Sequence, residues 1–146
     1  MGWPRHHGPD DLDRALAALP AGHVVRALGP ARFVLGPSGA QVVSLDDGSP
    51  DAPRAVARLA SVVRSALAER AAWVPYVDAF LVTDGDGPRP PATPVPPRLI
   101  PSTLVEGPAV LTRDELHRLV ACVEDGALDG LDAVAPDPRG HHVSPG

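Results

Sequence analysis

The sequence contains no lysine and no asparagine, and it has only one cysteine. All 13 basic residues are arginines, so a phosphate-binding loop with its lysine, a Schiff base to a pyridoxal cofactor and a lysine-assisted metal nuclease of the usual kind are excluded. Because Cys122 cannot form an internal disulfide, a secreted scaffold held together by bridges is excluded as well. This use of cysteine is typical of a protein in a reducing cytoplasm.

Long apolar runs and aromatic residues are also scarce. No window approaches the roughly eighteen consecutive apolar residues that a membrane-spanning helix needs, and residues 1–7 do not resemble a signal peptide. We therefore expect no membrane contact. Aromatic residues make up 3% of the chain, so the core has to be built from Ala, Val and Leu.

What is present indicates one domain. A chain of 146 residues that is 44% hydrophobic can bury a core of ordinary extent. We expect a flexible N-terminus over residues 1–7, a single domain over residues 8–126 and a disordered tail over residues 127–146, which is rich in Gly, Asp and Pro. The prolines concentrated in residues 85–101 predict a loop with extended polyproline geometry.

Hydrophobic periodicity predicts an alternation of helices and strands. The long helix of residues 51–70 is the clearest, because its apolar residues recur at the spacing of one buried stripe, with Asp51 as a capping carboxylate. Thr112 and Glu115 have the spacing of a capping box at the start of a last helix. The other predicted elements are a helix over 10–19 and strands over 23–28, 32–35, 40–45, 73–82, 103–106 and 109–111.

This order defines the expected fold class. We expect an α/β (α+β) fold with a mixed central sheet of four or five strands, in the order αβββαβ(β)α. The segment Gly36-Pro37-Ser38-Gly39 suits a type I turn between two antiparallel strands. The apolar strand that begins near Trp73 is expected at or near the centre of the sheet.

Two segments carry a resemblance to a known family. Gly8-Pro9-Asp10 opens a helix, and Phe33 to Val43 reads Phe-Val-Leu-Gly-Pro-Ser-Gly-Ala-Gln-Val-Val. Together they resemble the nuclease-related domain family of bacterial proteins, which has a restriction-endonuclease-like fold. Members of that family carry Gly-Glu at the helix start, Asp-His before the strand, then Gly-Pro-x-Gly-Val-Phe-Val-Val and Asp/Glu-x-Lys. The similarity covers residues 8–124 and implies the same fold.

The resemblance also implies that catalysis has been lost. The glutamate of the family falls on Pro9, its first aspartate on Ala31, its histidine on Arg32, its second carboxylate on Ser44 and its lysine on Asp46. A metal nuclease needs two or more carboxylates to hold Mg²⁺ beside the scissile phosphate, and a cation to activate water or stabilise charge. None of the five positions retains the expected group, so the resemblance implies an inactive member.

Two classes of function follow from these observations. The first is a catalytically inactive, cofactor-free cytoplasmic domain that binds or scaffolds a protein partner. The second is a divergent metal-dependent nuclease in which Asp46 and Asp47, with Asp51, gather a divalent ion at the end of the third strand. A generic α/β module with an accidental resemblance is a third interpretation.

Nucleic-acid and zinc binding have weaker support. Arg54, Arg58 and Arg64 are predicted on the outer side of the long helix and could meet phosphates, but the chain has a net charge of -5 and no aromatic platform nearby. The pairs His6-His7 and His141-His142 lack the spacing of zinc ligands, so we expect no metal site. Cys122 is expected to be a small, partly buried residue rather than a nucleophile.

Overall fold

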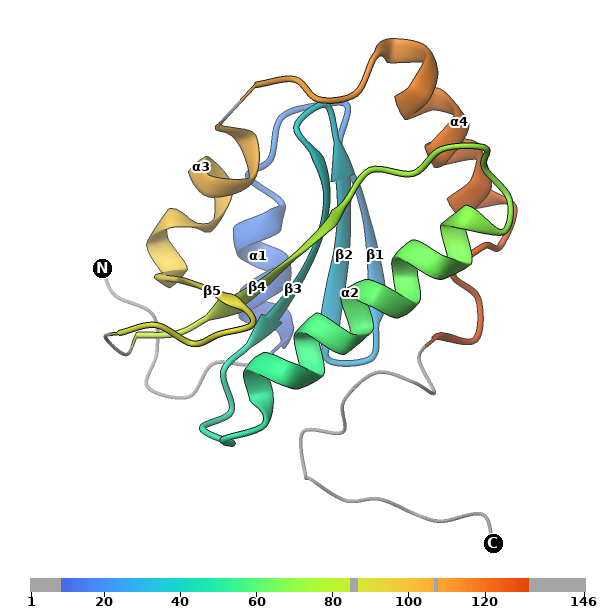
Figure 1. Ribbon diagram of the computed structural model, residues 1–146. Helices are drawn as coiled ribbons and strands as arrows, with labels where there is room; N and C mark the ends of the chain where they lie inside the picture. Colours follow the sequence, from blue (N-terminus) through green and yellow to red (C-terminus); the bar gives the residue numbers. More distant parts are fainter. Residues whose placement is uncertain (1–8, 85–86, 107, 132–146) are drawn as a thin grey trace, which may run out of the picture.

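The computed structural model describes residues 9–84, 87–106 and 108–131 of the chain (Figure 1). A five-stranded mixed sheet lies between two groups of helices. The prediction of a mixed α/β fold is therefore confirmed. Among the described residues, no helix combines the length and the apolar character that crossing a membrane requires.

The strands lie in the sheet in their sequence order. They are β1 (Val24–Leu28), β2 (Ala31–Gly36), β3 (Gly39–Leu45), β4 (Val77–Val82) and β5 (Thr93–Val95). The first three form an antiparallel meander, and β4 and β5 run parallel to β3. Because Gly36 pairs with Gly39, the turn between β2 and β3 contains only two residues, and the φ of +123° at Gly39 is a conformation that favours glycine.

The strand predicted from Trp73 lies between β3 and β5, as expected, but it starts later. Val77 pairs with Ala40, at the beginning of β3. The residues that precede Tyr76 have no neighbouring strand with which to pair, so they form a loop that leaves Trp73 exposed. The position of β3 therefore decides where β4 can begin.

The long predicted helix is α2 (Ala52–Ala68), which connects the parallel strands β3 and β4. Its expected stripe is buried throughout. The expected role of Asp51 is wrong, because this residue occupies the N-cap position without a side-chain cap hydrogen bond. Its backbone has helical φ and ψ of -90° and -6°, whereas a capping residue is usually extended. The carboxylate of Asp51 instead lies 3.9 Å from the guanidinium of Arg54.

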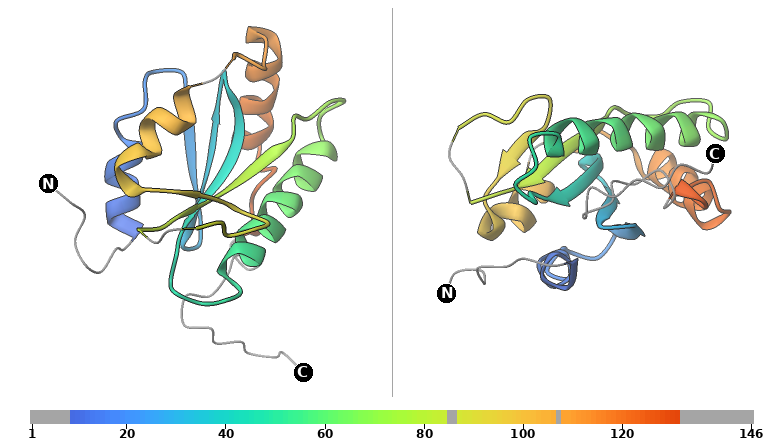
Figure 2. Two further views of the ribbon diagram at one scale, coloured as in Figure 1. Left: turned by 60° about the vertical axis from the view of Figure 1, so that its left-hand side comes forward. Right: turned by 90° about the horizontal axis from the view of Figure 1, so that it is seen from below.

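Helices cover both faces of the sheet (Figure 2), and an apolar core lies on each side of it. One lies under α2 and α4 (Arg113–Glu124), and the other lies under α1 (Pro9–Leu16) and α3 (Ile100–Val105). Phe33 and Leu35 point into the first core, while Val34 between them points into the second. This alternation is the period of two of a β-strand.

The loop prediction for residues 85–101 is wrong in part, because this segment contains β5, the 3-10 helix η1 (Pro97–Leu99) and the start of α3. β5 is an edge strand and pairs only with β4. A proline such as Pro94 is tolerated there because its missing N–H is not needed on the open side. Pro97 and Pro101 lie in the first turns of η1 and α3, where the absent donor costs little.

The predicted strands over 103–106 and 109–111 are also wrong. Ile100 and Leu104 are spaced by one helical turn and bury one face of α3, which ends at Val105. The segment before α4 is held differently, since the backbone N–H groups of Val110 and Leu111 donate to the carbonyl oxygen of Pro37 at 3.0 and 3.2 Å.

The C-terminal helix starts as predicted. Thr112 accepts from the N–H of Glu115 at 3.1 Å, and the Glu115 carboxylate accepts from the N–H of Thr112 at 2.8 Å, which completes the capping box. Beyond this helix, Leu128 is buried in the first core, so residues 127–131 belong to the fold rather than to a tail. The flexible ends predicted for residues 1–7 and 132–146, with both histidine pairs, lie outside the described residues.

Candidate functional site

The end of β3 is where the resemblance places a metal site. Ser44 is buried beside Leu81 of β4, and Ala31 begins β2 one residue before Arg32, which pairs with Val43. By continuation of that register, Ala31 lies opposite Ser44, and Asp46 follows directly. The tertiary structure therefore places four of the five positions that the resemblance singles out at one end of the sheet: Ala31, Arg32, Ser44 and Asp46. The fifth, Pro9, is the first residue of α1.

An arginine occupies this end of the sheet. Both terminal nitrogens of Arg89 donate to the two carboxylate oxygens of Asp46, the Nη2 to Oδ1 distance being 3.4 Å. The backbone N–H of Gly48 donates to the same Oδ1 at 2.9 Å. The exposed fraction is 10% for the Asp46 side chain and 27% for Arg89. The pair is therefore largely withdrawn from water.

The protonation of Asp46 follows from these contacts. Burial acts to raise its pKa, but hydrogen bonds from Gly48, Arg89 and Thr83, together with the charge of Arg89, outweigh burial and hold the pKa below its usual value. The carboxylate is thus ionised, and its charge is balanced by a guanidinium. A divalent cation would have to displace Arg89 to bind there.

The neighbouring acids do not converge with Asp46. The carboxylate of Asp47 is exposed and accepts from the N–H of Ser49 at 2.9 Å within its own turn, and Asp51 lies beside Arg54. Within the part of the chain that the structure describes, no group of three His, Cys, Asp or Glu residues is arranged to hold a metal ion.

Arg32, which the resemblance aligns with a histidine, is a structural residue. It is only 7% exposed. Its Nε and Nη2 donate to the carboxylate of Asp13 in α1 at 2.6 and 3.2 Å, and its Nη1 donates to the carbonyl oxygens of Gly29 and Ala31 at 2.8 Å each. The hydrogen bond from Arg32 lowers the pKa of Asp13, the charge of Arg32 adds to this effect, and burial opposes it. The pair fastens α1 to β2.

The three predicted phosphate contacts all lie on the exposed side of α2. Arg54 and Arg58 are one helical turn apart and Arg64 lies further along, while Arg54 is already near Asp51. The three arginines therefore form a sparse row on one helix.

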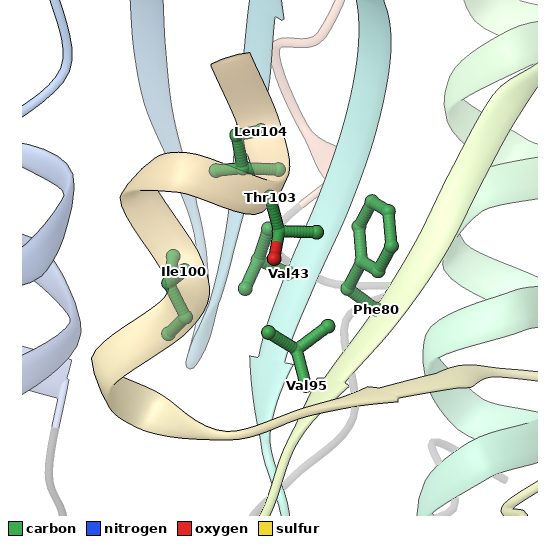
Figure 3. Close-up of a pocket in the computed structure, with 6 residues that line it drawn as sticks. All are labelled: Val43, Phe80, Val95, Ile100, Thr103 and Leu104. Carbon is green, nitrogen blue, oxygen red and sulfur yellow. The ribbon is translucent and has the colours of Figure 1, made fainter. Parts of the chain in front are cut away.

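Other hollows lie away from Asp46, and two of them are lined by residues of interest. Under α3, side chains from the sheet and the helix enclose an apolar crevice that has no room for a water molecule (Figure 3). It is a packing feature, and its lining residues are Val43, Phe80, Val95, Ile100, Thr103 and Leu104. A second hollow, of about 260 Å³, lies between α4 and the loop that follows α2. Cys122 lines it and is partly buried, as predicted.

Sequence reasoning located Asp46 but missed Arg89 and Asp13, the partners that define the chemistry here. Arg89 is 43 residues from Asp46, within the proline-rich segment, where no local pattern indicates an ion pair. The end of β3 can hold a compensated ion pair, but it offers few free ligands for a cation.

In comparisons with known proteins, the chain matches no family model, no curated protein and no solved structure.

Proposed function

We propose that this chain is a nuclease-related-like domain without catalytic activity that acts as a cytoplasmic protein-binding module. The observation that carries the proposal is the ion pair of Asp46 and Arg89 at the end of β3. The element order supports it too: one helix, three strands, a helix and two parallel strands agree with the order that the resemblance implies. The single cysteine is consistent with a reducing cytoplasm.

Charge explains why this arrangement disfavours nuclease chemistry. A metal nuclease concentrates negative charge so that Mg²⁺ can bind beside a phosphate. Here Arg89 already neutralises Asp46, and a divalent cation next to a guanidinium would be repelled. Ser44 offers one neutral oxygen and Ala31 offers no side-chain ligand. The remaining surfaces of the domain, rather than this end of the sheet, are then available for function.

A cleavage assay tests the proposal directly. Purified protein is incubated with plasmid and single-stranded DNA in the presence of Mg²⁺ or Mn²⁺. An Asp46→Ala variant, purified by the same procedure, is assayed in parallel. We expect no cleavage by the wild type above the level of the variant. Metal-dependent cleavage that disappears in Asp46→Ala would support the alternative, a divergent nuclease that uses Asp46 and Asp47.

A further inference from the structure

We propose that the hollow between α4 and the loop after α2 binds an acidic segment of a partner protein, with a carboxylate side chain held by Arg70 and Arg118. This inference rests on the proposed binding function and names where and what the domain binds. The lining of the hollow includes Arg70, Trp73, Glu115, Arg118 and Cys122. We call it the α2–α4 hollow.

The two guanidinium groups of the hollow differ in how they are held. Arg70 follows the C-terminal end of α2, and its Nη1 donates to the backbone oxygen of Asp125 at 3.1 Å, which fixes it beside α4. Arg118 is exposed on α4 and, among the described residues, has no ion pair or hydrogen bond. One arginine is thus preorganised and the other is available, which suits charge-assisted hydrogen bonds to a carboxylate.

The charge balance of the hollow favours an anion. It contains two arginines and one acid, Glu115, in a chain whose net charge is -5. The Glu115 carboxylate is turned toward the N-terminus of α4, where it accepts from the N–H of Thr112 at 2.8 Å. The local excess of positive charge therefore contrasts with the rest of the protein, and such contrast directs a partner of opposite charge.

The size of the hollow and the apolar surface beside it favour a side chain of a bound polypeptide over a free small molecule. At about 260 Å³, the hollow is smaller than the roughly 300–1,000 Å³ typical of small-molecule sites. Trp73 is 51% exposed at its rim, and indole side chains frequently anchor protein interfaces. An acidic residue in the hollow with an apolar neighbour on Trp73 matches both features. A nucleic acid would need a longer row of cations.

Peptide binding tests the proposal. The probes are a fluorescein-labelled peptide of alternating Glu and Leu and its counterpart of alternating Gln and Leu, titrated with full-length protein by fluorescence anisotropy. We expect the Glu peptide to bind about tenfold more tightly than the Gln peptide, and Arg118→Ala to lose about tenfold in affinity for the Glu peptide. Arg113→Ala, which removes another exposed arginine of α4 outside the hollow, should bind within about twofold of the wild type.

Cys122 provides a second readout that locates the bound peptide. It is the only cysteine and lines the hollow, so alkylation by iodoacetamide, a neutral reagent, reports on this place alone. Saturating Glu peptide should slow alkylation severalfold in the wild type. Circular dichroism of each variant confirms that a lost effect does not reflect unfolding.

Several results would overturn the inference. They are no saturable binding up to about 1 mM peptide, equal losses in Arg118→Ala and Arg113→Ala, or unchanged alkylation of Cys122 with peptide bound. If acetate or phosphate displaced the Glu peptide completely at concentrations similar to that of the peptide, the hollow would be a site for free small anions. Dimerisation abolished by Arg118→Ala would assign it to a second copy. None of these outcomes bears on the proposed loss of catalysis, which only Asp46-dependent DNA cleavage would contradict.

Discussion

Arginines play opposite roles in two regions of this domain. At the end of β3, Arg89 is largely buried and holds both oxygens of Asp46. In the α2–α4 hollow, Arg118 is exposed and unpaired among the described residues. An arginine therefore neutralises the carboxylate in the first region, whereas an arginine in the second region can still bind a ligand. The difference depends on whether the tertiary structure places a carboxylate beside the guanidinium, and three substitutions test this comparison.

Arg89→Ala should have the largest effect. It leaves the carboxylate of Asp46 mostly buried without its counter-charge, and removing one partner of such a pair is costly. Because the pair keeps some contact with water, we expect a loss of about 2–3 kcal/mol in the free energy of unfolding, measured by urea denaturation.

The matched control is Arg98→Ala, an exposed arginine in the same proline-rich part of the chain, for which a change within about 0.5 kcal/mol is expected. Equal effects of the two substitutions would show that the ion pair does not stabilise the fold. The Arg89→Ala protein should also bind no Mn²⁺ in calorimetric titrations, because the single carboxylate of Asp46 provides too few oxygen ligands for a divalent cation. Tight Mn²⁺ binding would indicate a latent metal centre.

Asp46→Asn should have a smaller effect that depends on pH. The pKa of Asp46 is lowered in the folded state, so its contribution is fully present above the unfolded pKa of about 3.9 and is lost as the pH falls through the folded value. The variant should therefore be less stable than the wild type by about 1 kcal/mol near pH 7, and this gap should narrow below about pH 4.

Asp47→Asn provides the matched control, because it changes the adjacent exposed carboxylate and keeps the ion pair of Asp46 and Arg89. At pH 7 it should change the free energy of unfolding by no more than about 0.5 kcal/mol. A constant gap for Asp46→Asn as the pH falls would contradict the linkage between Asp46 and folding.

Arg118→Ala should have the smallest effect on stability, within about 0.5 kcal/mol, because the residue is exposed and holds no partner among the described residues. The same substitution should weaken binding of the acidic peptide about tenfold. Stability and binding are then separated at Arg118. A loss above about 1.5 kcal/mol in urea denaturation would show that this arginine has a structural role.

The parts of the fold that could be predicted are those with strong local patterns. The stripe from Val56 to Leu67 has the period of a helix, and the turn at Pro37 joins two apolar runs, so α2 and the hairpin of β2 and β3 are recognisable without tertiary information. The proline-rich segment was predicted as a loop because prolines disfavour regular structure in isolation. Pro94 fits into β5 because this strand lies at the edge of the sheet, where the N–H group that proline lacks is not needed on the open side.

The candidate sites show the same limit. Asp46 follows an evident strand, but its partner Arg89 lies 43 residues away and becomes recognisable only when β5 places the proline-rich segment beside β4. The α2–α4 hollow is lined by Arg70, in the loop after α2, and by Arg118 of α4, and no local sequence pattern relates these two residues. Pairings of this kind depend on distances in space, which sequence separation does not report.

By itself, the sequence determined the chemistry that is available: no lysine, one cysteine, and no carboxylate at the positions where the family resemblance expects metal ligands. It also determined the main helix and the hairpin, because hydrophobic periodicity acts within a few residues. Only the tertiary structure decided which arginine is neutralised and which remains free. That choice depends on burial and on partners brought together by folding, since a guanidinium has the same charge in every local context.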